Sequence, residues 1–350
     1  MASQSASIAL GPYSESYLKT FYRAQFRTTP KLPPPNTNLS GHVAIITGAS
    51  GGLGLHAARH LLGLGLSHLI MAVRSRDKGH IAKVLLQAEF PHARIDVWSG
   101  LEMTDYGAIE TFTKRVNQDL PRVDMVVLNA GVAGMKFRVG STGHEEMVQV
   151  NFLSTVLLLI LLLPVLSAKS KASATGKATH ITMLGSALSY IAEIPKNMDA
   201  FILASLDTPK SFNQSRYSLS KFLLTLLFVR ISQFISPDRD GIVLNLIEPG
   251  YCKGTELSRD ARGGIKLLVK AFEGMFGRKP EDGAWMHVWA AAITGSETHG
   301  CYLQDWEIRP FPKVIHQKAG KDFTDLLWTQ TMKELNFARV QDILEQFQTR

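Results

Sequence analysis

Cysteine is scarce in this sequence: Cys252 and Cys301 are the only two among 350 residues. Two cysteines cannot form a disulfide framework, so we expect each to be a small core residue in a reducing compartment. The first residues also lack the charged and apolar segments of a secretory signal. These features predict a cytoplasmic protein.

Long hydrophobic runs are limited to one segment, Phe152 to Leu166. Its length of about 15 residues falls short of the roughly 20 that cross a bilayer, and Pro164 interrupts it. We therefore predict a buried helix in place of a transmembrane segment.

Charge of one sign is not concentrated anywhere in the chain. The net charge is +8, but the lysines and arginines are scattered, which argues against a nucleic-acid-binding surface and favours anionic small molecules as partners. The 11 histidines are dispersed singly, so we predict no metal site. No internal repeat is found.

Short apolar segments alternate with helical stretches from His42 onwards. This alternation is typical of a parallel sheet covered by helices on both faces, the doubly wound α/β arrangement of the Rossmann fold. We expect one domain at 41–320, an N-terminal extension with a proline-rich linker at 1–40 and a C-terminal helix at 321–350. The predicted strands are Val43–Thr47, His68–Val73, Ile95–Trp98, Met125–Leu128, His180–Leu184 and Gly241–Ile247.

The first predicted strand runs into a glycine-rich turn that precedes a helical stretch. Gly48 permits a tight turn, Gly52 lets a ligand approach the backbone, and Gly54 lets the helix lie near the strand. The helix N-terminus would supply amides for a pyrophosphate, with Ser50 and Leu53 in the same turn. The alternative is a glycine turn that only changes the direction of the chain.

The residues after the next strands predict which dinucleotide binds. No acid directly follows the second strand, where it would bind the ribose hydroxyl of NAD; Arg74 stands there instead. A guanidinium suits a 2′-phosphate, so we predict NADP(H), with Lys78 and Ser50 as helpers. A solvated surface arginine is the alternative. Glu102 would meet the adenine edge, and the small residues after Asn129 would let the backbone approach the cofactor ribose.

Four polar residues predict proton transfer beside the cofactor. Tyr217 and Lys221 are four positions apart, so on a helix they share a face. The positive charge of Lys221 would lower the pKa of the phenol, which lets Tyr217 act as general acid or base. Lys221 would also bind the nicotinamide ribose hydroxyls, so Tyr217 and Lys221 are predicted cofactor contacts as well. Ser186 would bind the substrate oxygen, and Asn151 would hold a water that relays protons to Lys221.

In this order the motifs resemble those of the short-chain dehydrogenase/reductase family over roughly residues 41 to 310. The matching motifs are Thr47-Gly48 through Gly54, Asn129-Ala130-Gly131, Asn151, Ser186, Tyr217 with Lys221, and Pro249-Gly250. The resemblance implies a catalytic tetrad of Asn151, Ser186, Tyr217 and Lys221, with Tyr217 as the proton donor. Within the family the chain resembles the retinol-dehydrogenase-like branch, especially filamentous-fungal members of secondary-metabolite pathways.

Three features depart from the family pattern. Ser186 and Tyr217 are about 30 positions apart, far more than is usual, which indicates an insertion at 190–214 near the substrate mouth. The family's P-G-x-V-x-T motif is altered after Pro249 and Gly250, so Cys252 and Thr255 are carried over as cofactor contacts in its place. Glu102 stands where the family usually has Asp.

Apolar residues away from the predicted cofactor site indicate the type of substrate and possible packing or dimer surfaces. The 255–290 region covers substrate in the family, and its apolar helical pattern indicates a lipophilic small molecule. The N-terminal stripe from Tyr17 to Phe26 is expected to pack on the domain, although covering the active site or lying on a membrane are alternatives. The apolar helix after Asn151 resembles a family dimer surface, so a homodimer stays open, although the terminal extensions would block it.

The main hypothesis is an NADPH-dependent oxidoreductase that reduces a carbonyl group on a lipophilic small molecule. Alcohol oxidation, or imine or enone reduction, uses the same hydride geometry and stays open. A third hypothesis is a non-catalytic NADP(H) sensor. The intact tetrad argues against it.

Overall fold

A single eight-stranded sheet forms the centre of the molecule in the computed structural model, which describes residues 5–172, 177–195, 201–254 and 263–349. The strand order is β3-β2-β1-β4-β5-β6-β7-β8, and all neighbours are parallel except β7 and β8. The strands are β1 Val43–Thr47, β2 His68–Val73, β3 Arg94–Ser99, β4 Met125–Leu128, β5 Thr179–Leu184, β6 Ile242–Glu248, β7 Cys301–Gln304 and β8 Glu307–Arg309.

The order of strands reverses between β1 and β4. Ligands of such sheets bind at the carboxyl ends of the strands beside this reversal. All the predicted strands are present, and each boundary lies within one residue of its prediction. β7 and β8 were not predicted.

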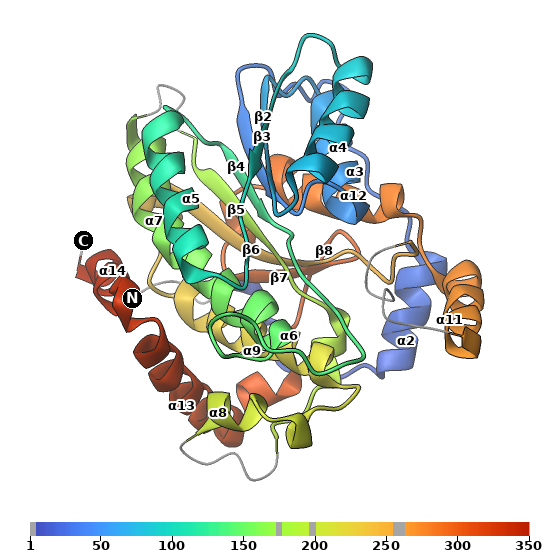
Figure 1. Ribbon diagram of the computed structural model, residues 1–350, viewed down its shortest axis with the longest axis vertical. Helices are drawn as coiled ribbons and strands as arrows, with labels where there is room; N and C mark the ends of the chain where they lie inside the picture. The colour runs from blue at the N-terminus through green and yellow to red at the C-terminus, as the bar shows by residue number, and fades with distance from the viewer. Residues whose placement is uncertain (1–4, 173–176, 196–200, 255–262, 350) are drawn as a thin grey trace.

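Helices cover both faces of the sheet, which confirms the doubly wound prediction (Figure 1). One face carries α3 (Gly52–Gly63), α4 (Arg76–Glu89) and α12 (Pro280–Val288). The other carries α5 (Tyr106–Asp119), α7 (Ser154–Ala172) and α9 (Arg216–Ser232). The short helix α10 (Pro237–Asp240) precedes β6.

The predicted apolar helix is buried inside the fold. It runs from α6 (Glu146–Val148) through a π-helical turn, η2 (Gln149–Leu153), into α7, and 83% of its most apolar window is buried. Pro164 does not interrupt it, contrary to the prediction, because α7 continues to Ala172. The buried side chains on both sides of the proline offset the hydrogen bond that it removes.

The C-terminal segment forms two helices where one was predicted. α13 (Lys318–Glu334) and α14 (Val340–Thr349) are separated by a 3-10 turn and by Arg339, whose φ of 52° ends the helical path. α14 packs against α7, the helix predicted to resemble a family dimer surface. α13 packs against α9 and against α8 (Ile202–Leu206), which places this part of the 190–214 insertion on the C-terminal helix. Residues 196–200 lie outside the described part.

The N-terminal extension lies beside the region that follows β6. α1 (Ala6–Ala9) precedes α2 (Tyr17–Tyr22) and a π-helical turn (Arg23–Arg27), and α2 lies next to α11 (Gly263–Phe276) (Figure 1). The Phe21 ring centroid is 6.4 Å from those of Tyr251, Phe272 and Phe276. The predicted packing of the N-terminal stripe is confirmed for Phe21, in only part of the stripe. Three other large apolar side chains of the stripe are exposed: Leu18, Tyr22 and Phe26.

Candidate active site

The glycine turn between β1 and α3 is shaped for close approach on both sides. Gly48 and Gly52 have φ angles of 67° and 53°, which favour glycine. A Cβ on Gly54 would lie 2.6 Å from Asn129 Nδ2 and 2.7 Å from the Gly48 carbonyl oxygen, so only glycine lets α3 lie this close. A Cβ on Gly51 or Gly52 would meet no atom within 4 Å, which leaves the outer side of the turn open. These residues fit the phosphates of a dinucleotide at the N-terminus of α3.

Asn129 joins the ends of β1 and β4. Its backbone N–H donates to Thr47 Oγ1 (3.0 Å) and its side-chain Nδ2 donates to the Thr47 carbonyl (2.9 Å). Its Oδ1 lies 3.2 Å from Nε2 of His287, which is fully buried on α12. Burial lowers the pKa of His287 to about 4, so its ring is neutral. His287 was not predicted, because nothing in its sequence surroundings distinguishes it from a core residue.

Arg74 follows β2 at the edge expected for an adenosine phosphate. Its side chain is 57% exposed, and its Nε lies 3.8 Å from Oε2 of Glu102, the residue predicted to meet the adenine edge. The structure thus brings these two predicted residues together. Ser75 caps α4 by accepting a hydrogen bond from the Lys78 backbone N–H (3.4 Å), which places Lys78 in the first turn beside Arg74.

Tyr217, Ser186 and Lys221 meet at the carboxyl end of β5. The Ser186 side chain lies close enough to Tyr217 to lower its pKa, although about 30 residues separate the two in the sequence. Lys221 lies one turn further along α9, is 2% exposed, and donates from Nζ to the Leu184 carbonyl at 2.7 Å. The structure therefore brings three of the four predicted catalytic residues together at the end of β5.

The electrostatics of this group differ from the expectation. Burial raises the pKa of Tyr217, and the carboxyl of Glu248 raises it further, while the hydrogen bond with Ser186 lowers it. We predicted a lowered value through Lys221, whose ammonium is instead directed at the Leu184 carbonyl. Burial lowers the pKa of Lys221 itself to about 7. The residues of the chain thus hold the proton on Tyr217.

Asn151 occupies the π-helical turn before α7 and is fully buried. Its Oδ1 accepts from the Val132 N–H (2.8 Å), and its Nδ2 donates to the Val132 carbonyl (2.8 Å) and to Ser220 Oγ (3.0 Å). A Cβ on Gly131 would lie 3.1 Å from Asn151 Oδ1 and 3.6 Å from Lys221 Nζ. Asn151 therefore lies next to Lys221, where it fixes the loop after β4.

The segment after β6 turns sharply at Gly250, whose φ is 87°. Arg278 Nη1 donates to the Pro249 carbonyl at 2.7 Å. Cys252 is 3% exposed, with its Sγ 3.5 Å from the Gly250 carbonyl oxygen, and burial raises its pKa to about 12. Its thiol is thus neutral and turned inward. Thr255 lies outside the described residues.

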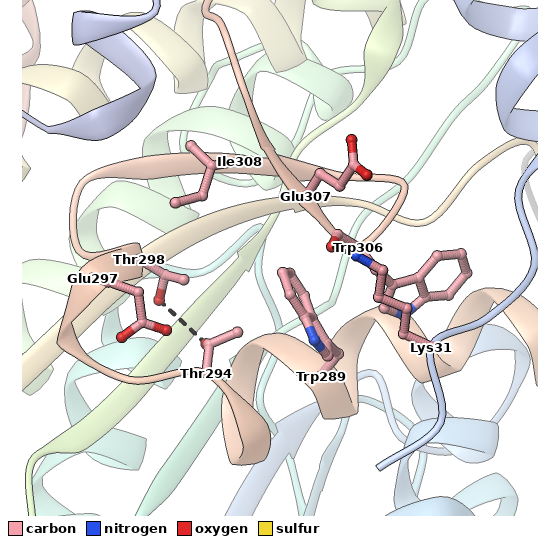
Figure 2. A pocket seen from close by; sticks show the side chains of 8 residues that line it. All are labelled: Lys31, Trp289, Thr294, Glu297, Thr298, Trp306, Glu307 and Ile308. Atoms are coloured by element: carbon pink, nitrogen blue, oxygen red, sulfur yellow. Dashed lines mark hydrogen bonds between the residues drawn. The ribbon is translucent and has the colours of Figure 1, made fainter. Parts of the chain in front are cut away.

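We also looked among the described residues for a metal site or a pocket away from the predicted catalytic residues. Within the described ranges no group of three His, Cys, Asp or Glu side chains would hold a metal ion. A shallow pocket of about 330 Å³ lies behind the β7–β8 turn (Figure 2). None of the predicted site residues lines it; its lining residues are Lys31, Trp289, Thr294, Glu297, Thr298, Trp306, Glu307 and Ile308.

Known proteins share both the sequence and the fold of this chain. Residues 42–181 match the family model described as short chain dehydrogenase. The chain is 44% identical over 327 residues to the short chain dehydrogenase/reductase mfmJ of Annulohypoxylon moriforme, covering 93% of each protein. It is 37% identical over 319 residues to the short chain dehydrogenase virL of Hypocrea virens, covering 91% of this chain and 92% of that protein.

Two solved structures show the same arrangement of strands and helices. L-sorbose reductase from Gluconobacter frateurii, solved with NADPH and L-sorbose, is 19% identical with a TM-score of 0.58, covering 77% of this chain and 96% of that chain. RhlG from Pseudomonas aeruginosa, solved with NADP, is 19% identical with a TM-score of 0.58, covering 81% of this chain and 100% of that chain. At this identity the likeness shows the fold alone.

Proposed function

This chain belongs to the short-chain dehydrogenase/reductase family, and from that premise we propose that it is an NADP(H)-dependent reductase of a carbonyl group on a lipophilic small molecule. The observation that carries the proposal is the partly exposed Tyr217 beside Ser186, with the buried Lys221 one helical turn away and bonded to the end of β5. A phenol that keeps its proton suits the donor of a reduction.

Each residue of the tetrad has a role in this proposal. NADPH, when bound, supplies the hydride. Ser186 orients the carbonyl oxygen toward Tyr217, which donates its proton to that oxygen and becomes a phenolate. Lys221 stabilises the phenolate by its charge, and Asn151 holds the loop after β4 against Lys221.

The preference for NADP(H) rests on Arg74. Its exposed guanidinium is available to a 2′-phosphate, and no acid stands directly after β2. Glu102 holds the guanidinium at the edge of the adenosine site. An arginine pairs with a phosphate through two parallel hydrogen bonds, which a ribose hydroxyl cannot match.

The substrate class rests on the aromatic cluster beyond β6. The Phe21 ring centroid lies 6.4 Å from those of Tyr251, Phe272 and Phe276, and the Phe272 centroid lies 5.5 Å from that of Tyr251 and 4.6 Å from that of Phe276. Such a wall favours a flat, lipophilic molecule. Both relatives, mfmJ and virL, come from fungi, which supports a fungal secondary metabolite as the substrate.

The test is to incubate the protein with deuterium-labelled NADPH and an extract of the source organism, and to search by mass spectrometry for products carrying one deuterium. Wild type should give a labelled alcohol. Tyr217→Phe should lower its formation at least about 100-fold, the contribution of a positioned proton donor, while NADPH affinity changes little. Tyr22→Phe, at a half-exposed position on α2, is the matched control. Retained activity in Tyr217→Phe would remove Tyr217 from this role, and no labelled product from wild type would defeat the reductase proposal.

A further inference from the structure

Gln25 is a half-buried residue of the N-terminal extension whose side chain reaches the segment after β6. It lies in the π-helical turn Arg23–Arg27, a rare kind of helix that is often found near functional sites. Its Nε2 donates to the carbonyls of Tyr251 (2.8 Å) and Phe276 (2.6 Å), and its Oε1 accepts from the Tyr251 N–H (3.1 Å). One side chain thus makes three hydrogen bonds to backbone groups that are 226 and 251 positions away in the sequence.

These hydrogen bonds also fix the orientation of the Gln25 amide. If the amide were turned over, its oxygen would face two carbonyl oxygens and its N–H groups would face the Tyr251 N–H. The amide packs directly on the turn at Gly250, whose φ is 87°, and a Cβ there would lie 2.9 Å from Gln25 Oε1. Any side chain at position 250 would therefore push Gln25 away from Tyr251.

Arg278 joins the same two parts of the chain. Its Nη2 donates to the carbonyl of Ala24, the residue before Gln25, and its Nη1 donates to the Pro249 carbonyl at 2.7 Å. Its backbone N–H donates to the Tyr251 carbonyl at 2.7 Å. The extension is thus bonded to the segment Pro249–Tyr251 directly through the Gln25 side chain, and through Arg278 by way of the Ala24 carbonyl.

The segment that Gln25 holds lies between the glycine turn and the tetrad. A Cβ on Gly283 would clash with Cys252 Sγ and would lie 3.1 Å from Leu53 Cδ2, so the segment and the glycine turn approach each other around Gly283. On its other side β6 pairs in parallel with β5, at whose carboxyl end three residues of the tetrad meet. A dinucleotide that runs from the glycine turn to the tetrad therefore passes this segment.

The segment differs from the family motif in the side chains that it presents. Gly254 stands at the position of the threonine in P-G-x-V-x-T, so there is no hydroxyl at that position. Cys252 is buried, with its Sγ 3.5 Å from the Gly250 carbonyl oxygen. The backbone is therefore the part of the segment that is suited to meet a ligand, and the bonds from Gln25 determine where that backbone lies.

We propose that Gln25 is a positioning residue of the NADP(H) site. By holding Tyr251 and the turn at Gly250, it sets the backbone against which the nicotinamide half of the cofactor binds. Gln25 itself touches neither cofactor nor substrate in this role. The effect on the cofactor rests on the proposed function, whereas the hydrogen bonds to Tyr251 exist without a cofactor.

The first experiment separates the nicotinamide half of the cofactor from the adenosine half. NADPH and adenosine 2′,5′-bisphosphate, which lacks the nicotinamide, are titrated into full-length protein by calorimetry. Gln25→Met keeps the length of the side chain and removes its hydrogen bonds. The affinity for NADPH should fall about tenfold, because the backbone groups of the segment lose their partners, and the affinity for the bisphosphate should not change.

Gln87→Met is the matched control. Gln87 Nε2 donates to the carbonyls of Phe90 (3.1 Å) and Ala93 (2.9 Å) in the turn between α4 and β3, at the edge of the sheet opposite the tetrad. This variant also removes hydrogen bonds between a glutamine amide and the backbone. Both affinities should stay at their wild-type values.

The second experiment measures the hydrogen bonds of Gln25 in cofactor-free protein. The protein is labelled with 15N-tyrosine, the Tyr251 amide signal is assigned with Tyr251→Phe, and its exchange with deuterated water is followed by NMR. The Tyr251 N–H should be protected in wild type and in Gln87→Met. In Gln25→Met it should exchange at least about tenfold faster.

Three results would overturn the proposal. They are an unchanged affinity of Gln25→Met for NADPH, an equal loss for both ligands as a general destabilisation would give, and an unprotected Tyr251 N–H in wild type. The last result needs no variant at position 25. A protein that binds NADPH and reduces no carbonyl would defeat the proposed function and leave these measurements unaffected, so the two failures are distinguishable.

Discussion

Replacing Lys221 with methionine is expected to stabilise the fold while it abolishes turnover. Lys221 is 2% exposed, and its Nζ donates a hydrogen bond to the Leu184 carbonyl at 2.7 Å. Burial lowers its pKa from 10.5 to about 7. Methionine preserves the length of the side chain and removes the charge, so the variant reports what the buried ammonium costs.

The magnitude follows from the difference in pKa between the folded and unfolded states. Because the unfolded chain takes up the proton first as the pH falls from 10.5, stability is lost until the folded chain is also protonated near pH 7. The fall of this pKa from 10.5 to about 7 corresponds to a cost of about 2 kcal/mol at pH 9 and about 5 kcal/mol at pH 6. Leaving the Leu184 carbonyl unpaired costs about 1–3 kcal/mol at either pH. Lys221→Met should therefore gain about 2–4 kcal/mol at pH 6 and close to nothing at pH 9.

The assay is urea unfolding of wild type and Lys221→Met at pH 6 and pH 9. The difference between the two proteins should grow by about 3 kcal/mol from pH 9 to pH 6, and this growth does not depend on the hydrogen bond to Leu184. Lys114→Met, at an exposed position on α5, should show no such growth. A difference that is constant with pH would refute the reasoning, because Lys221 would then not be a buried charge in the folded protein.

Two further predictions concern the cofactor site. Gly54→Ala should destabilise the fold by about 1–3 kcal/mol and weaken NADPH binding at least about tenfold, because the new Cβ would lie 2.6 Å from Asn129 Nδ2. Thermal unfolding measures the first effect and fluorescence titration the second. Gly51→Ala, whose Cβ would meet no atom within 4 Å, should leave stability unchanged. Arg74→Ala should weaken NADPH binding about 10- to 100-fold and leave NADH binding nearly unchanged by calorimetry, with the exposed Arg76→Ala as control; an equal loss for both cofactors would contradict the role of Arg74.

The sheet was largely predictable because most of its strands are short apolar segments, a sequence pattern that reflects their burial. β1, β2 and β4 are continuous apolar runs bounded by polar or glycine residues, as expected for parallel strands covered on both faces. β7 and β8 have four and three residues, too short for periodicity to distinguish them from a loop. Pro164 failed as a helix-breaker because the sequence does not show how deeply the flanking side chains are buried.

The candidate site was predictable only as far as its residues follow strand ends in a fixed order. Ser186 and Tyr217 were identified separately, and the structure was needed to show that their side chains meet despite the insertion. Glu248 had one available signal, a lone charge at the end of an otherwise uncharged strand, next to Pro249. His287 had none, because its partner Asn129 is 158 positions away.

The N-terminal extension holds a strained turn between β7 and β8. Asp305 and Trp306, between β7 and β8, both have φ of 57°, a conformation that costs a non-glycine residue about 1–2 kcal/mol. The extension holds both: Arg23 Nε pairs with Asp305 Oδ2 at 3.2 Å, and Lys31 Nζ donates to the Trp306 carbonyl at 3.0 Å, on the side shown in Figure 2. These two contacts offset part of that cost, so the extension stabilises the turn at the end of the sheet. A segment that appeared in the sequence only as an apolar stripe before a linker thus holds the β7–β8 turn in place.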